Sequence, residues 1–186
     1  LTEGMNIDKQ EAQPVAFYLN GAFYGMMILT ERTNEDYVEH NYGLKKDEID
    51  FLSVSAGYGY QCEAGTKEAY DKMLDYVRNH YESEEFYDEL DKMMDIDEYV
   101  DYQIIEQYVG NTDWVSNNTK LWRKHDGGRF RWILFDTDFG LSKATSVDKD
   151  MIKFATSEKG NEPMWTLLKS CLKNEDFRWK FLDQYL

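Results

Sequence analysis

The sequence is poor in cysteine and histidine and has no long apolar run. Its two cysteines, Cys62 and Cys171, form no C-x-x-C pair, and its three histidines lack the spacing of a metal site or a catalytic triad. No apolar stretch reaches the roughly 20 residues that a bilayer-spanning helix needs. Zinc binding, thiol redox chemistry and membrane insertion of this segment are therefore not expected.

Basic residues are also scarce relative to acidic ones. There are 21 Lys and Arg against 36 Asp and Glu, which gives a formal net charge of −15. Nucleic acids attract proteins with a basic stripe, and anionic membrane surfaces attract basic segments. Neither is an expected partner, and the charge is most simply interpreted as a solvated acidic surface.

Apolar and aromatic residues are abundant enough for a folded core. They make up 42% and 16% of the 186 residues, a length that suits one domain or two small lobes. The sequence begins at Leu1 without a Met or a signal peptide, which suggests a piece of a longer chain. The lack of a signal therefore says nothing about location.

The N-terminal third predicts a β-hairpin. Strands at 14–19 and 22–30 flank Asn20-Gly21, a strong short-range hairpin signal, and Gly25 suggests a bulge or a close backbone approach in the second strand. One interpretation is an ordinary hairpin. The other is that its tip forms a flap over a nucleotide.

The remaining elements follow from helical spacing and short apolar runs. The pattern predicts helices over 33–42, 66–81, 83–94, 95–108, 163–172 and 174–185, and strands over 49–54, 119–123 and 129–135. The helix at 83–94 is expected to be the more exposed one, and the helix at 95–108 has a capping-box-like start in Asp95 and Glu98. The predicted inward residues of the other helices are Tyr70, Met73, Leu74, Val77 and Tyr81, then Ile96, Val100, Ile104 and Tyr108, and finally Trp165, Leu168, Leu172, Phe177, Phe181 and Tyr185. Residues 1–13 are interpreted as a polar lead-in, and 55–65 as a glycine-rich loop that matches no phosphate-binding pattern. The polar stretch from 141 to 161 is either an activation-loop-like segment or a plain loop.

Acidic and amide residues frame the predicted hairpin of the C-terminal half. Asp113 precedes Asn118 by five residues, and Asp138 opens an Asp-Phe-Gly turn. Protein-kinase catalytic loops have this spacing between the base Asp and a metal-binding Asn, and a second metal-binding Asp stands in a downstream Asp-Phe-Gly. Each motif alone is common, and their order around a hairpin is the more specific signal.

The hairpin brings these residues together without any comparison with other proteins. It puts Asn118 at the start of one strand and Asp136 and Asp138 just after the end of its partner. These two ends are neighbours in an antiparallel pair. Magnesium takes oxygen ligands, usually one or two carboxylates completed by phosphates and water. The sequence thus predicts an oxygen-rich site that suits phosphoryl transfer.

Three stretches resemble the CotH (spore coat protein H) family of atypical secreted or surface protein kinases. They are YLNGAFYGMMILTER (18–32), DEYVDYQIIEQYVGNTDWVSNN (97–118) and RFRWILFDTDFG (129–140), and the closing WTLLKSCLKNEDFRWKF also fits. The resemblance extends from about Pro14 onward. It implies an α+β, divergent kinase-like fold in a single domain over 1–186. A small β-rich N-lobe at 14–62 and a helical C-lobe at 63–186 would surround the central hairpin.

The resemblance also implies an activity and the roles of the acidic residues. It implies ATP and magnesium as cofactors, a secreted or surface protein as the substrate, and a bacterial exterior or cell surface as the location. By position, Asp113 is expected to be the catalytic residue. Asn118 and Asp138 are expected to hold the metal, with Asp136 as an alternative or second ligand.

Three further residues are candidates for nucleotide binding. Trp132 matches an aromatic that the family presents near the nucleotide, with a packed strand residue as the alternative. Arg32 is a candidate for phosphate binding, or it forms a salt bridge with a neighbouring carboxylate. Tyr24 is a third candidate, for which an ordinary place on a strand face is the alternative.

Two departures from the kinase pattern leave the function open. The strand predicted at 49–54 has no Lys for the phosphates, and Asn111 and Thr112 stand where protein kinases have His and Arg. The acidic set favours an enzyme that phosphorylates a protein hydroxyl. The missing lysine favours a catalytically inactive kinase-like module for binding or scaffolding. A third alternative is an α+β domain whose acidic residues only cap turns.

Overall fold

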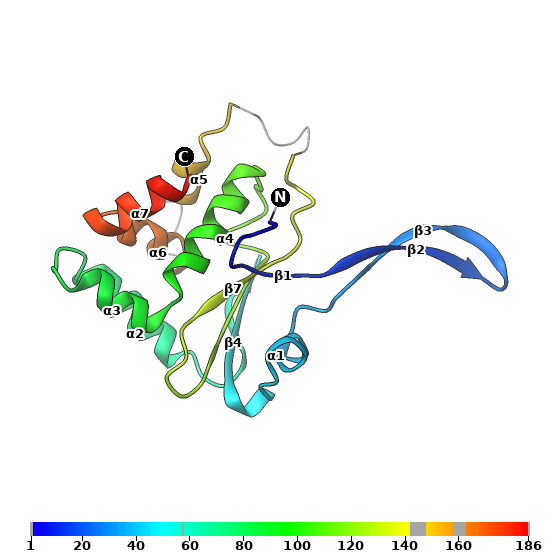
Figure 1. The fold of residues 1–186 in the computed structure, drawn as a ribbon, viewed down its shortest axis with the longest axis horizontal. Coiled ribbons are helices and arrows are strands. Elements are labelled where there is room, and N and C mark those ends of the chain that lie inside the picture. Colours follow the sequence, from blue (N-terminus) through cyan, green and yellow to red (C-terminus); the bar gives the residue numbers. More distant parts are fainter. Residues whose placement is uncertain (1, 57, 142–147, 158–162, 186) are drawn as a thin grey trace.

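The computed structural model describes residues 2–56, 58–141, 148–157 and 163–185, and they form a mixed α+β structure (Figure 1). The strands are β1 (Asp8–Lys9), β2 (Ala12–Leu19), β3 (Ala22–Thr30), β4 (Ile49–Ser55), β5 (Gly59–Ala64), β6 (Thr119–Lys124) and β7 (Arg131–Leu134). The helices are α1 (Glu35–Tyr42), α2 (Glu68–Asn79), α3 (Phe86–Met93), α4 (Ile96–Tyr108), α5 (Met151–Ala155), α6 (Pro163–Cys171) and α7 (Glu175–Tyr185), and a 3-10 turn spans Lys46–Glu48. None of the described helices is long and apolar enough to cross a membrane.

Five strands form one sheet in the order β1-β7-β6-β4-β5. The pair β1–β7 is parallel, and the other pairs are antiparallel. The predicted central hairpin is confirmed as β6–β7, with its turn at 125–128. The sheet joins strands from both predicted lobe ranges, so the division into lobes stays a prediction.

The two faces of the sheet bury different residues because strand side chains alternate in direction. Leu52 and Val54 of β4 pack into the main core with α2, α3, α4, α6 and α7, which gather on one side of the sheet (Figure 1). Ile49 and Phe51 of the same strand pack instead against Tyr37 of α1. Thus β4 is covered on both faces, which explains its almost complete burial.

Two strands arise where the sequence predicted none. The polar lead-in contains β1, and the predicted loop at 55–65 contains β5, which pairs with β4. Polar composition hid both, because edge strands form through main-chain hydrogen bonds to an existing partner. In β5, Tyr60 also stacks on Tyr70 of α2, with ring centroids 5.0 Å apart.

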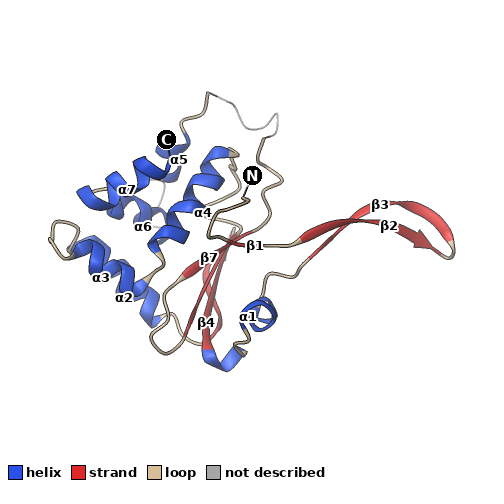
Figure 2. Ribbon diagram, viewed as in Figure 1, coloured by secondary structure: helices blue, strands red, loops and turns tan. Residues whose placement is uncertain are grey.

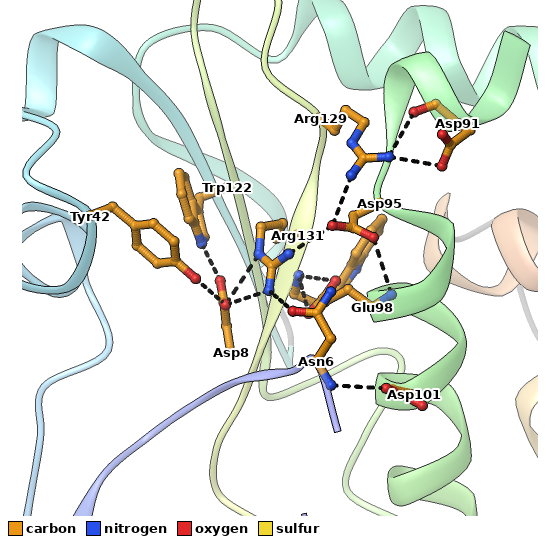
Figure 3. Close-up of polar contacts among 11 residues, drawn as sticks. Asn6, Asp8, Tyr42, Asp91, Asp95, Glu98, Asp101, Trp122, Arg129 and Arg131 are labelled. Atoms are coloured by element: carbon orange, nitrogen blue, oxygen red, sulfur yellow. Dashed lines mark hydrogen bonds and ion pairs between the residues drawn. The ribbon is translucent and has the colours of Figure 1, made fainter. Parts of the chain in front are cut away.

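Strand β1 is held by a buried cluster of polar contacts, shown in Figure 3. The carboxylate of Asp8 accepts hydrogen bonds from Trp122 Nε1 at 2.8 Å, from Arg131 Nη2 at 2.8 Å and from the Tyr42 hydroxyl. Arg131 also binds Asp95, at the start of α4, at 2.8 Å. One buried carboxylate therefore ties β1 to α1, β6 and β7, and Arg131 extends this connection to α4.

Helix α4 is more deeply buried than the amphipathic pattern predicted. Ile96 and Val100 are buried as expected, but the predicted inward residue Tyr108 is 64% exposed. Asp95 caps the helix by accepting from the Glu98 main-chain N at 3.4 Å. The Glu98 carboxylate does not complete a capping box and instead accepts from the Trp132 main-chain N at 3.0 Å.

The other helices largely follow the predicted faces. In α2, Tyr70, Met73, Leu74 and Val77 are buried, and in α6 and α7 so are Trp165, Leu168, Phe177 and Phe181. Helix α3 was predicted to be the more exposed one, yet its apolar residues at positions 86 and 90 are fully buried. Both cysteines are free.

The hairpin β2–β3 turns at Asn20-Gly21 as predicted and projects from the rest of the molecule (Figure 2). A register shift opposite Gly25 confirms the predicted bulge. The apolar side chains of this hairpin are exposed on both of its faces. The other apolar clusters lie in the body of the molecule, so the hairpin is an arm outside the core.

Candidate catalytic and metal-binding site

The site lies where α4 ends and the hairpin β6–β7 begins and ends. The described chain has five non-glycine residues with a left-handed φ, and four of them are here: Val115, Asn118, Asp136 and Leu141. The fifth, Asn20, lies in the turn of the arm. Such conformations cost about 1–3 kcal/mol each and persist where the surrounding structure holds them, often at functional sites. The gathering of four such residues in one region marks it as a candidate functional site.

Asp113 is held by two amides of its own loop. Its Oδ2 accepts from Asn117 Nδ2 at 3.0 Å and from Asn118 Nδ2 at 3.1 Å. The other amide atom of Asn117, Oδ1, accepts from the main-chain N of Ala56 at 2.9 Å, so Asn117 fastens the loop to the end of β4. No described residue donates to Asn118 Oδ1, which leaves that oxygen available for a metal ion.

Asp136 and Asp138 follow β7 two residues apart, and their carboxyl groups lie close enough to interact. The pKa of Asp136 is raised, first by burial, then by its interactions with Asp138 and by the charge of Asp113. The two acidic segments of the sequence therefore meet in the fold.

This donor set fits magnesium. It consists of carboxylates and one amide oxygen, which are hard ligands. No three His, Cys, Asp or Glu side chains among the described residues form a complete metal cage.

Asn111 connects the Asp113 loop to the segment that carries Asp136 and Asp138. Its Oδ1 accepts from the Asp113 main-chain N at 3.1 Å, and its Nδ2 donates to Glu106 Oε2 at 2.8 Å and to the Asp136 carbonyl at 3.4 Å. Glu106 is fully buried, which raises its pKa to about 8, with the Asp136 charge acting in the same direction. Sequence reasoning noted Asn111 only as a departure from the kinase pattern and missed Glu106, whose signal lies in its burial.

A lysine close to this site was also missed by the sequence analysis. Lys120, on β6 two residues after Asn118, donates to the carbonyl and Oγ1 of Thr33 and lies 4.8 Å from the centroid of the Phe135 ring. Burial lowers its pKa, and the nearby charge of Arg32 acts in the same direction. The strand predicted at 49–54 has no lysine, whereas Lys120 is on the adjacent strand β6, where it pairs with Ser53 of β4.

A comparison with models of protein families shows which family the chain belongs to. A family model described as CotH kinase protein matches residues 1–185. The chain belongs to the CotH kinase family. A comparison with curated proteins found no match. The resemblance of its three sequence stretches is thus confirmed, and membership indicates a kinase-like protein.

Two of the predicted nucleotide-binding residues of this CotH family member lie apart from the acidic site. Trp132 is fully buried and packs against Tyr99, with ring centroids 4.4 Å apart. Its side chain points to the helical side of the sheet and offers no surface to a nucleotide, so the packed alternative describes its place. Tyr24 is 66% exposed on the arm and contacts Phe17 edge to face.

Proposed function

We propose that this protein transfers the γ-phosphoryl group of ATP to a hydroxyl of another protein, with magnesium, in a divergent kinase-like fold. The observation that carries the proposal is that Asn111 joins the Asp113 loop to Asp136 at one end of the central hairpin, where Asp138 follows two residues later. The negative charges of Asp138 and Asp113 raise the pKa of Asp136, and a cation bound beside these carboxylates would relieve that repulsion. Family membership supports the same chemistry.

The roles follow from the positions. Asp113 orients the acceptor hydroxyl and takes its proton while the hydroxyl oxygen bonds to the γ-phosphorus and the bond to the β-phosphate oxygen breaks. Asn118, Asp138 and Asp136 would hold magnesium, which neutralises the developing charge on the phosphate oxygens. Asn111 fixes the position of the Asp113 loop relative to Asp136.

Lys120 and Arg32 are our candidates for binding the phosphates. They lie close enough for the charge of Arg32 to affect the pKa of Lys120. Strand β4 itself contains no lysine, so these residues would supply the positive charge that kinases place on a strand.

The test is the melting temperature of the protein with ATP, in the presence and absence of magnesium. ATP at about 100 times its Kd stabilises the folded state by about 2.7 kcal/mol, or roughly 5–10 °C for this length. Asp138→Ala should lose the magnesium-dependent part of this shift. Asp126→Ala, in the exposed turn at the far end of the same hairpin, should keep it.

Two further comparisons separate metal binding from catalysis and from loop structure. Asp113→Asn should bind magnesium and ATP but transfer no phosphate to casein or myelin basic protein as general acceptors. Asn118→Ala should weaken the response to magnesium at unchanged ATP, whereas Asn117→Ala should lower the melting temperature in the absence of ligand. The opposite result for this pair of asparagines would make Asn117 the metal ligand.

The competing function is an inactive kinase-like module for binding or scaffolding at a cell surface. The absence of lysine from β4 favours it. If the parent protein shows no magnesium-dependent shift with ATP, this alternative replaces phosphoryl transfer. A location outside or on the surface of a bacterial cell is proposed on the family resemblance alone.

A further inference from the structure

A pocket of about 680 Å³ lies directly beside the Asp113 loop. Thr112, Trp114 and Ser116 line it from the loop, and α5 with its flanking residues and α6 provide the remaining walls. Thr112 and Trp114 are the sequence neighbours of Asp113, each about 3.8 Å away along the backbone. Asp113 itself is not among the lining residues, so a chain segment in this pocket lies beside the loop that carries the proposed catalytic carboxylate.

The walls of the pocket are aromatic and well fixed. Phe154 of α5 packs edge to face on Trp165 of α6, with centroids 5.4 Å apart, and both line the pocket. Trp114 is nearly buried, and its Nε1 donates to the Tyr102 hydroxyl at 2.9 Å. The aromatic walls are thus held by core contacts and do not depend on a ligand for their position.

The charged residues of the pocket are predominantly basic. Lys149 and Lys153 line it, together with Asp150, whose Oδ1 is engaged by the main-chain N of Lys153 at 2.8 Å. The Lys149 ammonium lies 4.0 Å from the centroid of the Phe154 ring, which directs it over the pocket wall. Neither lysine forms an ion pair with any described carboxylate. In a molecule with a net charge of −15, this local excess of positive charge is unusual.

We propose that this pocket selects the acceptor by an anionic side chain, a carboxylate or a phosphate, located within a few residues of the accepting hydroxyl. An extended segment advances about 3.4 Å per residue, so a side chain a few residues from the accepting hydroxyl can extend from the Asp113 loop into the pocket that the lysines line. The aromatic walls bind the aliphatic part of the segment, and the lysines bind the negative charge. That the bound segment is a phosphate acceptor rests on the proposed function. That the pocket binds such a segment does not rest on it.

The experiment measures peptide binding without nucleotide. An immobilised library carries a central Ser, and each flanking position is fixed in turn as Glu, phosphoserine, Ala or Lys. The parent protein should retain peptides with Glu or phosphoserine at one position about fivefold better than peptides with Lys, the ratio expected from two solvent-exposed ion pairs. A larger preference for phosphoserine would identify acceptors that are already phosphorylated.

Charge reversal in the pocket provides the decisive comparison. The double variant Lys149→Glu, Lys153→Glu should reverse the preference to Lys at the same position. The control Lys72→Glu, Lys124→Glu makes the same change in net charge at exposed residues of α2 and β6 and should keep the parent preference. The double variant Lys149→Gln, Lys153→Gln should lose the preference without reversing it. This variant replaces the glutamate variant in the comparison if the glutamate variant does not fold.

Failure of this inference can be distinguished from failure of the proposed function. An equal retention of Glu and Lys peptides at every position, or an unchanged preference in the pocket variant, overturns the inference even if ATP and magnesium stabilise the protein. The peptide preference could be present while magnesium and ATP neither raise the melting temperature nor support phosphate transfer. In that case the pocket is a peptide-binding site, and the proposed phosphoryl transfer is wrong.

Discussion

Asn111 is the residue through which the two acidic segments of the site contact each other, and its position depends on Glu106. The Glu106 carboxyl accepts from Asn111 through Oε2, while its buried Oε1 has no hydrogen-bond partner. Burial raises the pKa of Glu106 to about 8. At neutral pH the folded state therefore holds a neutral Glu106, which avoids an uncompensated charge next to Asp136.

Glu106→Gln should flatten the pH dependence of stability. Between about pH 4.5, the ordinary pKa, and about pH 8, the folded state binds a proton at Glu106 that the unfolded state has released. The free energy of unfolding therefore falls as the pH rises through this range, by up to about 1.4 kcal/mol per pH unit. Glutamine is neutral throughout and keeps the acceptor for Asn111, so the variant should lack this contribution.

Urea unfolding at pH 5, 6, 7 and 8 with EDTA measures this effect. The difference between parent and Glu106→Gln isolates Glu106 from the other acidic groups, because they are present in both proteins. Glu106→Ala removes the acceptor as well and should cost about 1–3 kcal/mol over the whole range. Parallel pH profiles for the parent and the glutamine variant would show that Glu106 titrates normally.

At the residue scale, the sequence identified groups with a fixed spacing and missed groups defined by burial. Asp113, Asn118 and Asp138 could be located because a loop and a hairpin place them by their position along the chain. Glu106 and Lys120 have no such local signal. The role of Glu106 depends on its burial within α4, and that of Lys120 on the pairing of β6 with β4. Neither feature is visible in the spacing of the residues.

At the scale of elements, β4 and β5 show how a single glycine determines a connection. Gly65, which follows β5, has a φ of +67°. A Cβ at this position would lie 2.3 Å from Asp50 Oδ1 and 2.4 Å from the Ile49 carbonyl. Asp50 is fully buried, and its carboxylate also binds Arg123 Nε at 2.7 Å. The main chain after β5 thus passes so close to β4 that only glycine fits.

Gly65→Ala should destabilise the protein by about 2 kcal/mol more than Gly59→Ala. Both residues have a positive φ, which costs an alanine about 1–2 kcal/mol in either position. A Cβ at Gly59 meets no atom within 4 Å, so only Gly65→Ala adds the cost of overpacking. Urea unfolding of the two variants measures the difference, and equal losses would show that the chain around Asp50 shifts freely.

The same elements show where sequence patterns were insufficient. The hairpins β2–β3 and β6–β7 were predictable because turn residues and strand composition are local. Strands β1 and β5 were not, because each depends on a partner strand elsewhere in the chain. For β1 the deciding contact is between Asp8 and Arg131, which are 123 residues apart.

At the scale of the whole molecule, the arm β2–β3 contrasts with the rest of the protein. Residues 12–30 contain no charged side chain, although 31% of the chain is charged. Nine large apolar residues of the arm are exposed, among them Tyr24 at 66% and Met26 at 65%. Exposed apolar strands with open edges favour association with other chains.

Replacing residues 13–29 by Asn-Gly should leave the body of the protein intact. Ala12 and Thr30 already face each other across the hairpin, so a two-residue turn can join them. Since the arm lies outside both apolar clusters, the melting temperature at micromolar protein concentration should change by less than about 3 °C, the effect of roughly 1 kcal/mol at this length. Binding of the dye ANS should fall, because the arm carries most of the exposed apolar strand surface. A fall of 10 °C or more would mean instead that in solution the arm packs against another surface, and a melting temperature of the parent that rises with protein concentration would identify that surface as a second copy of the chain.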